Sequence, residues 1–131
     1  MVDQVLNEKL IEDGRVLLQN LDDSGLAVKA ALWIYLPDLR SWRLMLSFPD
    51  VRTKGPKAAY TRVQSALNKL KKRGCTLALD EVSVAAPDAP LMKLLRGEIT
   101  TNSGIHGIRF TQHVIDGQLV EDAYIYRLMA G

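Results

Sequence analysis

The C-terminal part of the chain carries polar and aromatic side chains at alternating positions, a spacing that gathers them on one side of a β-strand. Arginine can hold a carboxylate or phosphate through two hydrogen bonds, histidine titrates near physiological pH, and aromatic rings offer area for stacking. A surface with all three could bind a small anionic or planar ligand, or another protein. The residues concerned are Arg109, Thr111, His113, Asp122, Tyr124 and Tyr126.

A tight turn decides which of these side chains share a side. Asp116-Gly117 stands between two apolar dipeptides, and Asp-Gly is typical of the two-residue type I′ turn of a β-hairpin. Such a turn determines the pairing of both strands, with apolar pairs on the core side and the polar and aromatic set on the other. The predicted ladder pairs Ile115 with Gln118, Val114 with Leu119, His113 with Val120, Thr111 with Asp122, Phe110 with Ala123, Arg109 with Tyr124, Ile108 with Ile125 and Gly107 with Tyr126.

Residues 26–36 and 42–48 predict a second antiparallel hairpin, with a turn at Pro37-Asp38. Pairing Leu36 with Trp42 collects the apolar residues of both strands on one side, the condition that normally determines register. Ile34 then faces Leu44, Leu32 faces Leu46 and Ala30 faces Phe48. The opposite side of this hairpin carries Trp33, Tyr35, Arg43 and Met45, with Tyr35 opposite Arg43 and Trp33 opposite Met45. Together with the polar and aromatic set of the C-terminal hairpin, these residues form what we call the non-core face.

Exposed patches rich in aromatic residues are typical of protein contacts. We therefore expect the non-core face to bind a second copy of the chain, giving a homodimer, or another protein partner. One alternative is a small-ligand or catalytic site at Arg109, His113 and Asp122, which requires a concave pocket there. Another is an ordinary half-exposed sheet face with cross-strand pairs.

Residues 100–107 combine small hydroxyl side chains with glycines, which leave backbone N–H groups accessible, as in anion-binding nests. The segment matches neither the phosphate-binding loop nor the dinucleotide fingerprint. A connecting loop is therefore the preferred interpretation. The candidate anion contacts are Thr101, Ser103, Gly104 and Gly107.

Residues 51–79 contain eight bases and no acid, although the net charge of the chain is only +2. Clustered bases are how proteins neutralise phosphates, so nucleic-acid binding is a possible function. Residues 56–73 predict a helix whose apolar stripe faces the core, and the bases spread over its whole polar surface. A solvated helix face is the preferred interpretation. The candidate nucleic-acid contacts are Lys54, Lys57, Arg62, Lys69 and Lys72.

Other chemistry finds little support in the sequence. His106 and His113 would point to opposite faces of one extended strand, so no metal site is expected. We find no catalytic motif, expect no cofactor, and expect the single cysteine, Cys75, to be buried as a small apolar residue. No apolar run approaches the ~20 residues of a membrane span, and no secretory signal is recognisable, so we expect a cytoplasmic protein without a membrane partner.

We expect residues 1–131 to form a single α+β sandwich, with a mixed, mostly antiparallel sheet of about five strands and helices on one face. The expected order is α-β-β-α-β-α-β-β. The first helix should run from Asp3, as its N-cap, to about Leu21, and Gly14 on its apolar stripe suggests close approach of another backbone. The whole pattern favours a non-enzymatic interaction module.

Overall fold

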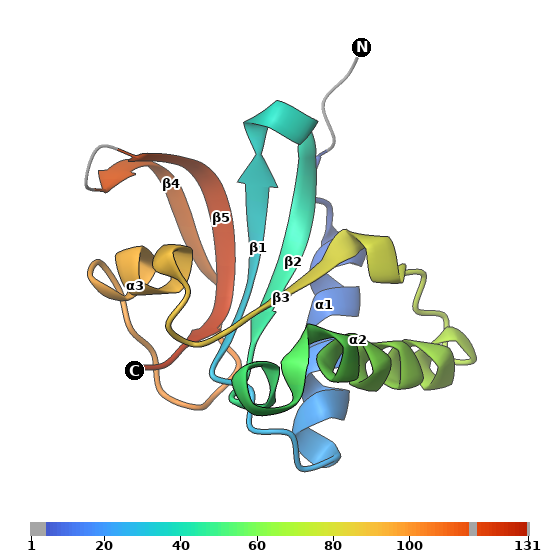
Figure 1. The fold of residues 1–131 in the computed structure, drawn as a ribbon. Coiled ribbons are helices and arrows are strands. Elements are labelled where there is room, and N and C mark those ends of the chain that lie inside the picture. Colours follow the sequence, from blue (N-terminus) through green and yellow to red (C-terminus); the bar gives the residue numbers. More distant parts are fainter. Residues whose placement is uncertain (1–4, 116–117, 131) are drawn as a thin grey trace.

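In the computed structural model, which describes residues 5–115 and 118–130, three helices pack against a five-stranded sheet (Figure 1). The predicted α+β class and element order are confirmed. The strand order is β3-β2-β1-β5-β4, and β2 and β3 are the parallel neighbours in a sheet that is otherwise antiparallel. The elements are α1 (Glu8–Asp23), β1 (Ala30–Leu36), the 3₁₀ turn η1 (Pro37–Leu39), β2 (Ser41–Ser47), α2 (Asp50–Lys71), the 3₁₀ turn η2 (Leu79–Glu81), β3 (Val82–Ala85), α3 (Pro90–Arg96), β4 (Ile108–Ile115) and β5 (Gln118–Leu128).

Helix α1 begins later than its apolar periodicity predicts. The side chain of Asn7 accepts a hydrogen bond from the backbone N–H of Leu10 at 2.9 Å, and this cap starts the helix at Glu8. The predicted cap, Asp3, precedes this start and lies outside the described residues. Leu17, Leu18 and Leu21 form the buried stripe of the helix.

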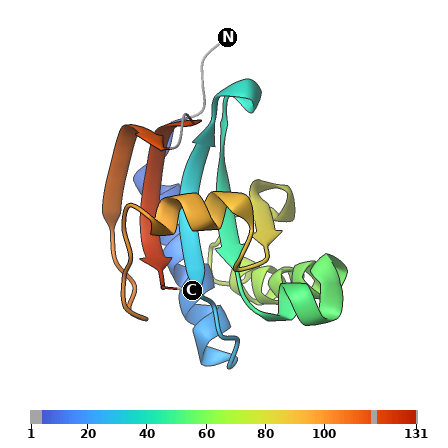
Figure 2. The ribbon, with the colours of Figure 1, turned by 60° about the vertical axis from the view of Figure 1, so that its left-hand side comes forward.

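Helices cover both faces of the sheet, so the expectation that they lie on one face was wrong. Helices α1 and α2 pack on one face, over Trp33 and Leu44, and α3 packs on the other, where Met92 and Leu95 meet Leu32. Figure 2 shows α3 in front of the sheet and α1 behind it. The chain therefore has two apolar clusters with the sheet between them, and neither sheet face is left open as a whole.

The register of the β1–β2 hairpin differs from the predicted one by a single residue. Leu36 pairs with Ser41 across η1 and Arg40, and Arg40 adopts a left-handed conformation with φ 49°. This shorter connection turns Leu44 toward Trp33 instead of Ile34. The observed pairs are Leu36–Ser41, Tyr35–Trp42, Ile34–Arg43, Trp33–Leu44, Leu32–Met45, Ala31–Leu46 and Ala30–Ser47.

The β4–β5 register agrees with the prediction. Ile115 pairs with Gln118, and the pairs continue in step down to Ile108 with Ile125. The predicted turn residues, Asp116 and Gly117, lie outside the described residues.

A β-bulge interrupts the pairing of β5 with β1. Ala31 pairs with Arg127, whereas the next residue, Leu32, pairs with Ile125, so Tyr126 is the extra residue. A bulge shifts the alternation of side chains by one position. Tyr126 and Arg127 consequently both reach α1, Tyr126 at Ile11 and Arg127 at Asp22.

The basic helix is broken near its start. Gly55 has φ 85° and ψ 163°, and Pro56 follows it at the first turn of the longer segment. The predicted apolar stripe is buried, and the chain leaves the helix through Gly74 with φ 91°. The stripe consists of Ala59, Val63, Ala66, Leu67 and Leu70.

Candidate functional site

The predicted partner face is not one continuous exposed surface, because two of its large side chains are in the core. Trp33 is 0% exposed and Tyr126 1% exposed, and both lie in the cluster formed with α1 and α2. Arg43 and Met45 were also predicted on this face. The shifted register pairs them with Ile34 and Leu32, and Met45 packs in the α3 cluster. The grouping of these four residues as a docking surface was therefore wrong.

Trp33 and Tyr126 form a buried polar contact with α1. The Trp33 indole N–H donates to the Tyr126 hydroxyl at 2.9 Å, and that hydroxyl donates to the carbonyl of Ile11 at 2.5 Å. Burial raises the pKa of the Tyr126 hydroxyl, although the Trp33 hydrogen bond opposes the shift. A Cβ atom at Gly14 would lie 2.8 Å from Trp33 Nε1, so side chains, and not the predicted backbone, make the close approach. This arrangement is a packing site.

The part of the predicted face that remains accessible is centred on Arg109. Its guanidinium bonds both carboxylate oxygens of Asp122, at 2.7 and 2.6 Å, and lies 5.6 Å from the centroid of the Trp42 ring. Tyr35 contacts the edge of Trp42, with 5.6 Å between ring centroids. Asp122 is thus engaged by Arg109, and a bound carboxylate or phosphate would have to compete with it.

The remaining members of this predicted set lie nearby. Thr111 is exposed and pairs with Asp122, and Tyr124 is half-buried against Tyr126. The side chain of His113 lies outside the described residues. The proposed ligand site at Arg109, His113 and Asp122 therefore has two of its members in contact, with a satisfied ion pair in place of an open anion receptor.

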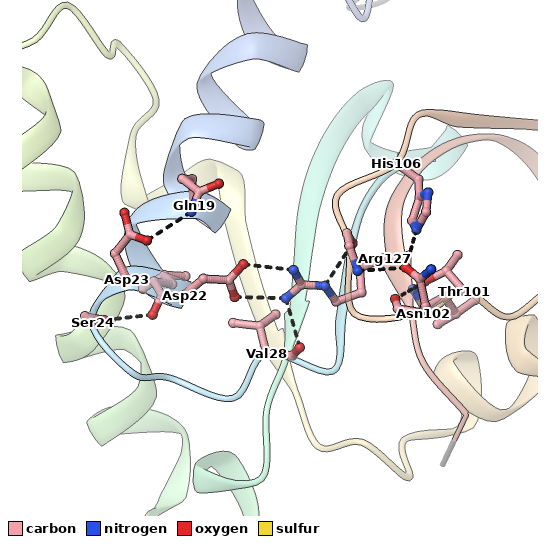
Figure 3. A network of polar contacts seen from close by, with 12 residues as sticks. Gln19, Asp22, Asp23, Ser24, Val28, Thr101, Asn102, His106 and Arg127 are labelled. Atoms are coloured by element: carbon pink, nitrogen blue, oxygen red, sulfur yellow. Dashed lines mark hydrogen bonds and ion pairs between the residues drawn. The ribbon is translucent and has the colours of Figure 1, made fainter.

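The predicted anion loop uses its polar groups to attach itself to β5 (Figure 3). The N–H of Thr101 donates to the carbonyl of Leu128, and the N–H of His106 to that of Tyr126, each at 2.7 Å. Asn102 Oδ1 accepts from the N–H of Gly104 at 2.8 Å and contacts the His106 ring at 2.7 Å. These N–H groups are not available to an anion, which supports the connector interpretation.

The other two members of the anion set have different surroundings. Ser103 is exposed and lines a hollow beside Arg127. Gly107 lies so close to the Tyr124 hydroxyl that a Cβ atom there would be 3.1 Å from Tyr124 Cζ. Close packing explains this glycine without a ligand.

A buried arginine joins this loop to α1 (Figure 3). The Arg127 side chain is 4% exposed and bonds both carboxylate oxygens of Asp22, at 2.9 and 2.8 Å. It also donates to the carbonyls of Val28 and Gly104, each at 3.2 Å. A hollow of about 300 Å³ lies beside it, lined by Asp22, Ser103 and Lys29 among others. Because Arg127 is bonded on three sides, its first role is to hold these elements together.

Sequence reasoning missed the Asp22–Arg127 pair. The two residues are far apart in the chain, and only the bulge on β5 turns Arg127 toward α1. A buried-strand pattern interrupted by a single arginine, as in Tyr126-Arg127-Leu128, was the signal that could have indicated a buried ion pair.

The outer edge of β4 is a second accessible feature. Strand β4 stands at the end of the sheet, and β5 is its neighbour among the described strands. Val114 on this strand is 69% exposed, one of the most exposed large apolar side chains of the described residues. Figure 2 shows β4 at one end of the molecule and α2 at the other.

The third feature is the outer surface of α2, where the sequence-predicted cations lie. Lys57, Lys69 and Lys72 are exposed. Lys54 and Arg62 are exposed too, but each lies near Asp50, at 3.7 and 4.0 Å. The structure therefore presents all five predicted nucleic-acid contacts at the surface and partly neutralises two of them.

Within residues 5–115 and 118–130, no group of three His, Cys, Asp or Glu side chains is placed to hold a metal ion. The helices of this described part are too short or too polar to cross a membrane. Cys75 is buried as a free thiol, and desolvation raises the pKa of that thiol.

Comparison of the chain with protein-family models, with curated proteins and with solved structures finds no match.

Proposed function

We propose that this protein is a non-enzymatic interaction module that self-associates by pairing β4 with β4 of a second copy. The observation that carries the proposal is the position of β4 as an end strand of the sheet, with β5 as its neighbour among the described strands. The dimer expected from the sequence is kept, but its contact moves from the buried sheet face to the strand edge. We retain the cytoplasm as the expected compartment.

An edge strand presents a row of N–H and C=O groups that can template pairing with another chain. Natural proteins discourage such pairing with proline, lysine, bulges or short edge strands. Strand β4 has eight residues, contains neither proline nor lysine, and keeps one register along β5. Its arginine, Arg109, is already paired with Asp122. This edge therefore lacks the usual features that prevent pairing.

A second copy is the occupant because an antiparallel strand pair is self-complementary. A twofold axis perpendicular to the sheet would bring the two β4 strands together antiparallel and form one continuous sheet of ten strands. The same rotation keeps the α1 side of one copy on the α1 side of the other. The pairing requires no change in either helix layer.

The β4–β4 contact would bury a small area, so we expect the dimer to be weak. Stable interfaces bury roughly 1,600 Å², and two paired edge strands bury much less. We expect a monomer–dimer equilibrium with a Kd of about 10 to 100 μM, a range typical of weak contacts.

The test is the molar mass in solution for the parent chain and for Val114→Lys. The added charge on the edge should shift the equilibrium to monomer, because an edge lysine opposes strand pairing. Val5→Lys is the matched control, since Val5 has the same 69% exposure and is not on β4. Sedimentation equilibrium from about 5 to 500 μM, a range spanning the expected Kd, measures the change.

The molar masses of the parent chain and the two variants show whether β4 forms the interface. A dimer in the parent chain and in Val5→Lys, but not in Val114→Lys, supports the proposal. A constant monomer mass at all concentrations overturns it. A dimer that survives Val114→Lys and disappears in Val5→Lys places the interface elsewhere, and this too overturns β4 pairing.

A further inference from the structure

The outer surface of α2 carries positive charge that the fold leaves largely uncompensated. Asp50 lies near Lys54 and Arg62, and Asp88 pairs with Arg52. Asp50 is the first residue of α2, and Asp88, from the segment before α3, lies beside the same end through its pair with Arg52. The ion pairs found among the described residues do not involve the remaining cations of the segment, which are Lys57, Lys69, Lys71, Lys72 and Arg73.

The C-terminal end of α2 concentrates this charge. Lys69 and Lys71 in the last turn of α2, and Lys72 and Arg73 directly after it, are all exposed. Lys9 of α1 donates to the carbonyl of Gly74 at this end, but its charge is paired with Asp13 at 2.8 Å. Cations at a helix C-terminus also stabilise the helix dipole. That benefit is confined to the last turn, however, so it does not account for Lys57 at the other end.

The spacing of the cations suits an extended anion. From Lys57 to Lys71 the helix is about 21 Å long at 1.5 Å per residue. The exposed positions between the cations also hold Ser65 and Asn68, whose hydroxyl and amide groups can donate to phosphate oxygens. The surface thus offers charge and hydrogen-bond donors over several turns.

The types of side chain exposed on α2 favour one class of polyanion over the others. The exposed positions of α2 hold no large apolar side chain that could enter a lipid layer. They also hold no exposed aromatic ring for stacking on unpaired bases, because Tyr60 is half-buried with its hydroxyl accepting from the N–H of Val84. We infer that α2 binds the phosphate backbone of duplex nucleic acid, without regard to base sequence.

Such binding has a measurable signature. Neutralising about four phosphates of B-DNA gives a slope near −3.6 for log affinity against log salt, so affinity should fall about a hundredfold between 50 and 200 mM salt. A 30-base-pair duplex of mixed sequence, labelled with a fluorophore, is the probe. Fluorescence anisotropy measured at several salt concentrations gives the slope.

Lys72→Gln and Lys93→Gln are the matched variants. Both lysines are exposed and each change removes one charge, but Lys72 directly follows α2 and Lys93 is on α3. Lys72→Gln should weaken binding severalfold and reduce the salt slope by about 1, whereas Lys93→Gln should change neither. The combined Lys57→Gln, Lys69→Gln, Lys72→Gln variant should lose binding at all but the lowest salt, with its circular dichroism spectrum unchanged.

Several results would overturn the inference. One is no anisotropy change in 20 mM salt, where phosphate contacts are least screened. Another is equal loss of affinity in Lys72→Gln and Lys93→Gln. A third is tighter binding to phosphatidylserine vesicles, to polyglutamate or to the single-stranded 30-mer than to the duplex. Because α2 and β4 are at opposite ends of the sheet, these results are independent of the proposed dimer.

Discussion

Gly14 is the residue on which the packing of α1 against the sheet depends most directly. It lies beside the Trp33 indole and the Tyr126 hydroxyl, two groups of fully buried rings. Glycine in a helix interior costs up to ~1 kcal/mol relative to alanine, so its presence needs a compensating reason. The hydrogen bonds from Trp33 to Tyr126 and on to Ile11 are that reason, because they need the space that a Cβ would fill.

Gly14→Ala should therefore destabilise the protein by about 1–3 kcal/mol, the usual cost of overpacking, despite the better helix propensity of alanine. Urea unfolding followed by circular dichroism measures the change. In a Tyr126→Phe background, which removes the closest hydroxyl, the same substitution should cost less. Equal costs in both backgrounds would show that Tyr126 does not define the space at Gly14.

The Tyr126 hydroxyl should also make stability depend on pH in the alkaline range. Burial raises its pKa in the folded chain above the ordinary value near 10, so the unfolded chain loses this proton first. The free energy of unfolding should therefore fall as pH rises above about 10, by up to ~1.4 kcal/mol per pH unit from this group. Tyr126→Phe should be less stable at pH 7 but have a shallower decline between pH 9.5 and 11. An identical decline in both proteins would count against this role.

At the level of elements, a bulge on β5 joins three segments that are distant in the chain. It turns Arg127 toward the C-terminal end of α1, where the guanidinium meets Asp22, and the same side chain bonds the carbonyl of Gly104 in the loop before β4. A buried charge is tolerated only when it is paired and hydrogen-bonded. The orientation of α1 and the position of the loop are thus linked through one side chain.

Asp22→Ala should cost about 3 kcal/mol, because it leaves a nearly buried guanidinium without its carboxylate. Asp122→Ala is the matched control, since it breaks the other two-point arginine–aspartate pair, in which Arg109 is 49% exposed. Asp122→Ala should lower the free energy of unfolding by no more than about 1 kcal/mol. Chemical unfolding of both variants gives the comparison, and similar losses would mean that the burial of Arg127 adds nothing.

The whole molecule is a sheet covered on both faces by helices, with its accessible features at the two ends. Strand β4 is the end strand of the sheet on one side, and α2, with its exposed cations, lies at the other end (Figure 2). The acidic residues are concentrated elsewhere, including Glu8, Glu12 and Asp23 on the exposed side of α1. This separation lets the net charge of the chain be small while α2 remains strongly positive.

Local patterns were sufficient for the parts of the fold that depend on neighbours in the chain. The apolar stripe of the α2 segment was predicted from helical periodicity, and the β4–β5 register from the Asp-Gly pair, because both signals come from local geometry. The element order followed from the same patterns. The exposure of the α2 cations also follows from that periodicity.

The tertiary structure alone decided which faces are covered, and with them the fate of the predicted site. Both sides of β1 are apolar, so hydrophobic alternation could not determine its register with β2 or reveal that α3 covers the second face. The bulge that brings Arg127 to Asp22 depends on pairing between segments distant in sequence. Burial of Trp33 and Tyr126 is likewise a property of packed layers, since the same alternating pattern is compatible with an exposed face until a helix occupies it.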